Sequence, residues 1–239
     1  MFLRYCLLYL ASSYAIAATL YDEIALTSGG SAVHFKEYSS VRVYEKYRSL
    51  SPAIELNWKK YIYNNIGLSI DSNGSYDMEI DSHYEINNGA RSYKAHGITL
   101  DGHLMMLFPL IKKWDLEAGI GAGAGTFWIK SERRPNADYN SYPHGYLPTA
   151  QLIKKYSLNK NFRGELMGRV SRLDFEKYNT MLKGYAFFIE HSFLFNESKN
   201  LSHGIKVGYS HWIFDKPLFD ITSNSKLSRF TIGYEFRLR

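Results

Sequence analysis

Apolar and polar residues alternate strictly along the middle of the chain. From Trp114 to Trp128 every even position is Trp, Leu, Ala, Ile or Thr, whereas Asp115, Glu117 and four glycines occupy the odd positions up to Gly125. A period of two over some fifteen residues predicts a β-strand with one apolar face. The two Trp residues would lie roughly 45 Å apart, which suits a tilted strand that crosses a bilayer and its interfaces.

The same period recurs near residues 162–171 and 230–239, where apolar residues share one face and charged residues share the other. In a soluble sandwich the apolar face would be core, whereas in a membrane barrel it would meet lipid and the charged face would line the lumen. Connections between the predicted strands are alternately short and long, as in outer-membrane barrels. The strands are predicted near residues 20–29, 50–58, 62–80, 93–109, 114–130, 146–157, 162–174, 181–195, 201–214 and 227–238.

These strands predict an all-β fold, a transmembrane antiparallel up-and-down barrel of about ten strands, with eight or twelve as alternatives. An even number of strands puts both termini in the periplasm. Long connections are expected at residues 30–49, 81–92, 131–145, 175–180 and 215–226, outside the cell. Short turns are expected at 59–61, 110–113, 158–161 and 196–200.

The N-terminus has the pattern of a secretory signal peptide. Arg4 precedes an apolar run that ends in Ala15-Ile16-Ala17, so residues 1–17 are predicted to be the signal and residues 18–239 the barrel domain. The only cysteine, Cys6, lies inside the signal, which excludes a disulfide framework or a cysteine metal site in the mature chain. The predicted location is the Gram-negative outer membrane.

The face of each predicted strand opposite the apolar one carries many charged residues of both signs, and this face would line the lumen. A barrel of about ten strands is little wider than one that its own side chains fill. Because an unpaired buried charge costs several kcal/mol, we expect these charges to pair and plug the lumen; a narrow channel is the alternative. The predicted lumen residues are Glu23, Glu55, Asp71, Asp101, His103, Glu117, Glu165, Glu190, Glu235, Lys155, Arg163, Arg169, Lys206 and Arg237.

The signal peptide, the Gly-rich strand that ends at Trp128 and the Tyr-rich connections together resemble the opacity, OmpX and OmpA-barrel group of small outer-membrane proteins. The resemblance implies a rigid barrel that displays loops for adhesion or envelope integrity. The last strand, with Gly233, Phe236 and Leu238, also resembles the signal that barrel-assembly machinery recognises, although the chain ends in Arg239 instead of Phe or Trp.

The net charge of +6 is modest and, in an exported protein, indicates no nucleic-acid partner. The expected partners are outer-membrane lipid, lipopolysaccharide and a possible host or envelope ligand at the loops. The sequence indicates no metal or organic cofactor. The candidate partner-binding residues are Lys36, Arg42, Lys46, Arg48, Arg133, Arg134, Tyr139 and Tyr142.

A membrane-embedded hydrolase is the enzymatic alternative to this non-enzymatic reading. Asp77, Asp81 and His83 would share one face of an extended strand, and a carboxylate beside an imidazole can orient a general base. This arrangement invites comparison with the omptins, ten-stranded outer-membrane proteases that use an aspartate pair and an Asp-His couple.

Two Ser-His adjacencies, His191-Ser192 and Ser210-His211, are compared with outer-membrane lipid A deacylases, in which Ser and His form a hydrolytic pair. Adjacent residues of a strand point to opposite faces, so neither pair can share a proton as written. Pairing between the last strands remains a way to bring other Ser and His residues together.

Overall fold

A computed structural model describes residues 22–38, 44–63, 66–86, 89–131, 144–177, 180–198, 200–215 and 224–239. The predicted signal peptide lies outside these residues. The described residues form ten strands and one short 3₁₀ turn, η1 (Lys112–Trp114). The strands are β1 (Glu23–Tyr38), β2 (Tyr44–Tyr63), β3 (Ile66–Ile86), β4 (Gly89–Ile111), β5 (Leu116–Ser131), β6 (His144–Ser157), β7 (Phe162–Lys177), β8 (Thr180–Asn196), β9 (Leu201–Phe214) and β10 (Asn224–Leu238).

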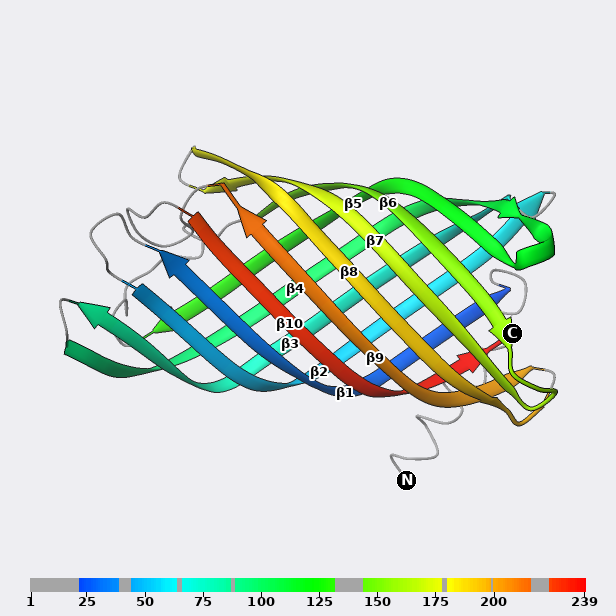
Figure 1. The fold of residues 1–239 in the computed structure, drawn as a ribbon, viewed down its shortest axis with the longest axis horizontal. Coiled ribbons are helices and arrows are strands. Elements are labelled where there is room, and N and C mark those ends of the chain that lie inside the picture. The colour runs from blue at the N-terminus through cyan, green and yellow to red at the C-terminus, as the bar shows by residue number, and fades with distance from the viewer. Residues whose placement is uncertain are drawn as a thin grey trace, which may run out of the picture.

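The strands form one closed barrel, in which each strand pairs antiparallel with its neighbours in the chain and β10 pairs with β1 (Figure 1). The predicted ten-stranded up-and-down barrel is therefore confirmed. The seam pairs Ile24 with Leu238, so β1 begins and β10 ends at the same end of the barrel. We call this the terminal end, at the right of Figure 1, and the opposite one the distal end. No helix among the described residues is long and apolar enough to span a membrane.

The two faces of the sheet are sorted as the alternation predicts. On β10 the side chains of Phe230, Ile232 and Phe236 are about half exposed on the outside, whereas Glu235 and Arg237 are 1% and 4% exposed. A soluble protein would bury the first set and expose the second. An apolar exterior around a charged interior is the arrangement of a barrel whose solvent is lipid.

The strands extend further toward the distal end than the sequence predicts. The connection expected at residues 30–49 is largely strand, because β1 continues to Tyr38 and β2 begins at Tyr44. The connection expected at 81–92 is likewise wrong, since β3 continues to Ile86 and β4 begins at Gly89. In the sequence of these extensions polar residues occupy both odd and even positions, so the apolar period that marks a strand disappears while backbone pairing continues.

Trp114 is a smaller exception. It was predicted to open a strand, but it lies in η1, and the chain reverses at Asp115 in the left-handed region with φ 49° before β5 begins. The predicted turn is therefore displaced by about two residues, within the usual uncertainty of element boundaries.

Candidate functional site

The terminal half of the lumen is filled by a network of ion pairs. Arg237 on β10 contacts Glu23 at 3.1 Å, Glu165 at 2.8 Å and Glu235 at 2.5 Å. Lys59 on β2 reaches the first two of these carboxylates at 3.5 and 3.0 Å. Side chains from β1, β2, β7 and β10 thus meet inside the barrel, and each charge has an opposite partner.

A second group of pairs lies nearer the middle of the barrel. Lys206 bridges Glu55 and Glu190, the latter at 2.6 Å. Arg169 pairs with Asp71 and also donates to Nδ1 of His103 at 2.9 Å.

The predicted pairing of lumen charges is confirmed for these residues. Two further cations, Lys59 and Arg229, were not among the predicted lumen residues. Arg229 pairs with Asp101 at 3.0 Å. Lys59 was assigned to a turn, although the two-residue period that runs from Glu55 through Asn57 would have placed it inside.

The remaining predicted lumen residues lie close to the terminal mouth. Lys155 contacts Glu117 at 2.8 Å and the hydroxyl of Tyr61 at 2.9 Å, and Arg163 donates to Ser202. Two cavities of about 470 and 220 Å³ open here, and Lys155, Asp115 and Arg239 line both. Deeper in the network, the cavity among the glutamates that contact Lys206 and Arg237 measures only about 10 Å³. That is room for about one water molecule.

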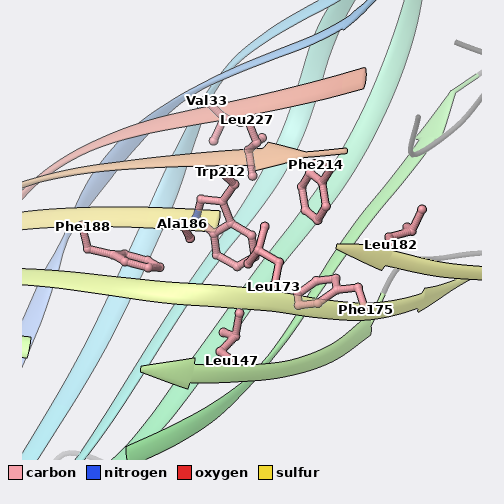
Figure 2. Close-up of a cluster of buried hydrophobic side chains, with 10 residues drawn as sticks. All are labelled: Val33, Leu147, Leu173, Phe175, Leu182, Ala186, Phe188, Trp212, Phe214 and Leu227. Atoms are coloured by element: carbon pink, nitrogen blue, oxygen red, sulfur yellow. The ribbon is translucent and has the colours of Figure 1, made fainter. Parts of the chain in front are cut away.

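The distal half of the lumen contains an apolar cluster, shown in Figure 2. Trp212 lies at its centre, with its ring 5.9 Å from those of both Phe175 and Phe188. The prediction of a polar lumen along the whole barrel is therefore wrong for this half. The cluster residues come from β1 and β6 to β10, and they are Val33, Leu147, Leu173, Phe175, Leu182, Ala186, Phe188, Trp212, Phe214 and Leu227.

Gly125 on β5 makes room for this cluster. A Cβ on Gly125 would lie 3.2 Å from the Phe175 ring and 3.3 Å from Leu147 and Trp212. Phe188 connects the apolar cluster to the ion pairs, because the Arg169 guanidinium lies 5.7 Å from the centre of its ring and the His103 ring lies 5.8 Å from that centre. The interior is therefore continuous from the ion pairs to the aromatic rings.

The hydrolase candidate on β3 lies at a break in the strand register. A register shift between Asp77 and Ile80 inserts an extra residue opposite β4, so the two-residue alternation is interrupted between Asp77 and Asp81. The shift separates Asp77 from the regular alternation, whereas Asp81 and His83 remain two residues apart in an uninterrupted register. Their side chains lie outside the described part of the structure.

The two Ser-His adjacencies behave as strand geometry requires. Ser192 points inward and donates to Glu235 at 2.6 Å, while His191 contacts the Tyr156 hydroxyl. Ser210 is buried, whereas His211 points outward. Pairing of β9 with β10 places His211 opposite Ser228, and its Nδ1 lies 2.8 Å from the Ser228 Oγ. A Ser-His pair therefore exists on the outer face of the barrel.

The candidate partner-binding residues divide into two sets. Lys36 lies on β1 and Lys46 and Arg48 on β2, where Lys36 is opposite Lys46, so these three belong to strand extensions and not to a loop. The other candidates lie outside the described residues, and they are Arg42, Arg133, Arg134, Tyr139 and Tyr142. In the part of the chain that is described, no group of three or more His, Cys, Asp or Glu side chains is arranged to hold a metal ion.

Comparison with solved structures supports the architecture. The outer membrane protease OmpT from Escherichia coli aligns with a TM-score of 0.60 at 6% identity over 91% of this chain and 96% of its own. The chain has the fold of a small outer-membrane β-barrel protein. The NalP translocator domain from Neisseria meningitidis (TM-score 0.43, 10% identity, 96% and 95% coverage) and OprG from Pseudomonas aeruginosa (0.42, 10%, 92% and 97%) are more distant matches. No family model and no curated protein sequence matches the chain.

We predict that Arg237→Gln destabilises this barrel by about 3 to 5 kcal/mol, because it leaves three buried carboxylates without their shared cation. Urea titration of the folded protein in detergent micelles, followed by tryptophan fluorescence, measures the change. Lys60→Gln is the control, since Lys60 pairs with Asp22 at 3.2 Å where both side chains are about one-third exposed, and its loss should cost less than about 1 kcal/mol. Equal effects of the two substitutions would contradict a structural role for the network.

Proposed function

We propose that this protein spans the Gram-negative outer membrane as a closed scaffold, with the terminal end in the periplasm and the distal ends of the strands at the cell surface. The observation that carries the proposal is the filled lumen. Two cavities of about 470 and 220 Å³ open at the terminal mouth, but the cavity deeper among the glutamates that contact Lys206 and Arg237 measures only about 10 Å³. Beyond it, the distal cluster surrounds Trp212, Phe175 and Phe214, which are 0% exposed. A barrel filled in this way supports surface display and not transport.

The distal extensions are the part of the scaffold that a partner can reach. They carry Lys36, Lys46 and Arg48 of the candidate residues, and basic residues bind anionic surfaces. We propose an acidic glycan of a host cell or of the envelope as the partner. The fold by itself does not select this role, since function depends on the site and not on the architecture.

Closure of the lumen predicts that the protein does not conduct ions. The folded wild-type chain, inserted into planar bilayers in concentrated KCl, should show no stable conductance steps, because ion pairs and aromatic rings occupy the path. An established porin inserted under the same conditions is the positive control. Reproducible ohmic steps from the wild-type protein would replace the scaffold with a narrow channel.

Surface binding should weaken when the charges and tyrosines of the connection between β5 and β6 are removed. Bacteria that display a variant with Arg133, Arg134, Tyr139 and Tyr142 all replaced by Ala should bind immobilised sulfated glycan several-fold less than bacteria with the wild type. Lys112→Ala with Lys113→Ala, at the terminal end, should leave binding unchanged. Undiminished binding by the distal variant would rule out this connection as the contact surface.

A second candidate function, hydrolysis of a lipid acyl ester, is favoured by the hydrogen bond between His211 and Ser228. In this reaction Ser228 Oγ attacks the ester carbonyl carbon while His211 Nδ1 accepts its proton. The alcohol leaves with that proton, and water then releases the fatty acid from the acyl-serine. The pair faces outward beside Phe187, Tyr209 and Phe230, which are 44–48% exposed, so a membrane lipid can approach it.

The matched test compares Ser228→Ala with Ser192→Ala, because Ser192 lies inside the barrel and cannot meet lipid. Each variant is reconstituted with lipopolysaccharide, and released fatty acid is measured by mass spectrometry. Hydrolysis requires release by the wild type and by Ser192→Ala, with a loss of about a hundredfold or more in Ser228→Ala. Absence of release from the wild type, or equal release from all three proteins, would exclude this activity.

A further inference from the structure

The terminal mouth of the lumen contains two neighbouring cavities, which lie outside the sealed part of the barrel. The smaller measures about 220 Å³ and the larger about 470 Å³, and Asp115, Lys155 and Arg239 line both. Cavities that hold small molecules in proteins usually measure about 300 to 1,000 Å³. The mouth therefore has room for a small ligand, in contrast to the cavity of about 10 Å³ deeper in the network.

Most charged side chains that line the smaller cavity are already paired within the protein. The pairs are Lys155 with Glu117, Arg239 with Glu23, and Arg237 with Glu165, each at 2.8 Å. The charges of these pairs cancel. They give the cavity no preference for an anion or for a cation.

Arg163 on β7 is the exception among the cations that line this cavity. Its Nη2 donates to the hydroxyl of Ser202, its Nε is buried without a hydrogen-bond partner, and no carboxylate of the described residues pairs with its guanidinium. A guanidinium presents five N–H donors in a planar fork that fits a carboxylate. Because a partly buried cation without an anion is costly, a carboxylate from a ligand would stabilise Arg163.

Asp115, in the turn before β5, is the corresponding exception among the acids. It is exposed, lines the same cavity as Arg163, and has no cation within contact distance in the part of the chain that is described. Its backbone carbonyl accepts a hydrogen bond from the amide of Lys155 at 3.0 Å, which holds the turn beside β6. The smaller cavity thus offers one unpaired cation and one unpaired carboxylate, and a ligand that satisfies both must carry both charges.

The separation of these two residues indicates the length of the ligand. Ser157, two residues beyond Lys155 on β6, is opposite Arg163 on β7. Arg163 and Asp115 are therefore two inter-strand gaps and two residue steps apart, or about 12 Å between their backbones. Their side chains take up part of this length. An extended peptide of two or three residues spans about 7 to 11 Å, whereas a single amino acid carries both charges on one carbon.

We propose that the terminal mouth binds a short peptide of two or three residues with free ends. The peptide carboxylate pairs with Arg163 and the peptide ammonium pairs with Asp115. Leu194 and Leu116, which line the smaller and the larger cavity, contact the side chains of the peptide. This site is separate from the proposed surface display, and only the source of the peptide, the periplasm, rests on the proposed orientation of the barrel.

The test is isothermal titration calorimetry with the full mature chain folded in an uncharged detergent. The probes are trialanine, N-acetylated trialanine, which lacks the ammonium, and trialanine amide, which lacks the carboxylate. The wild type should bind trialanine at least about tenfold more tightly than either blocked form, because each blocked form loses one charged hydrogen-bonded pair. Alanine alone should also bind at least about tenfold more weakly, because it cannot reach both residues.

Two substitutions assign the two ends of the peptide. Arg163→Gln should weaken trialanine binding at least about tenfold and leave binding of the amide unchanged, because the amide has no carboxylate for Arg163 to contact. Asp115→Asn, which suits the left-handed turn, should weaken trialanine binding at least about tenfold and leave binding of the N-acetylated form unchanged. Lys112→Gln is the control, since Lys112 lines only the larger cavity, and it should bind trialanine as the wild type does.

The proposal is overturned if the wild type does not bind trialanine, if it binds both blocked forms as tightly, or if Lys112→Gln loses as much affinity as Arg163→Gln. Binding of alanine as tight as that of trialanine would also overturn it, because one carbon would then carry both charges. If a variant lacks the gel shift on boiling that marks a folded barrel, the four probes on the wild type still decide. A conducting lumen would refute the closed scaffold without altering these affinities.

Discussion

Closure of the sheet between β1 and β10 is the constraint on which the rest of this structure depends. In lipid every backbone amide and carbonyl must be paired within the protein, and a barrel without edges satisfies all of them. Closure also creates an interior that ten strands cannot leave empty or fill with unpaired charge. Arg237 shows both consequences, since it binds Glu23 across the seam and Glu165 on β7, three strands away. The same side chain therefore holds the seam and fills the lumen.

The two layers of the interior fill space in different ways. In the terminal layer charged side chains pair with opposite charges. The free-energy cost of burying them is offset because each of these carboxylates has a cation within contact distance. The distal layer removes polarity altogether, with Trp212, Phe175 and Phe188 packed edge to face. Because the interior is closed at both levels, the groups left for contact with lipid are on the exterior, where the His211–Ser228 pair lies among exposed apolar side chains.

Much of the fold could be predicted from the sequence. Wherever one face of a strand meets lipid, the two-residue period shows which residues point outward and which point into the lumen. Glu165, Arg169, Lys206 and Arg237 were placed inside on that basis. The period fails where lipid ends, so the strand extensions that carry Lys36 and Lys46 were read as loops. It also cannot show a bulge such as that after Asp77, or tell that Leu173 and Phe175 continue an inward face. The contact between His211 and Ser228 depends on strand register, which the sequence pattern does not specify.

The central claim is that the exterior meets lipid and the interior is sealed. Single cysteines test it directly, with Cys6, the only cysteine of the chain, replaced by Ser. On β8 and β9 the inward substitutions are Ser192→Cys and Ser210→Cys, and the outward ones are Phe193→Cys and Tyr209→Cys. In proteoliposomes the account predicts that a membrane-soluble maleimide labels the outward cysteines and that neither it nor a charged, water-soluble maleimide labels the inward ones. Rapid labelling of the inward cysteines by the charged reagent would contradict a sealed lumen, and its labelling of the outward ones would contradict a lipid-facing exterior.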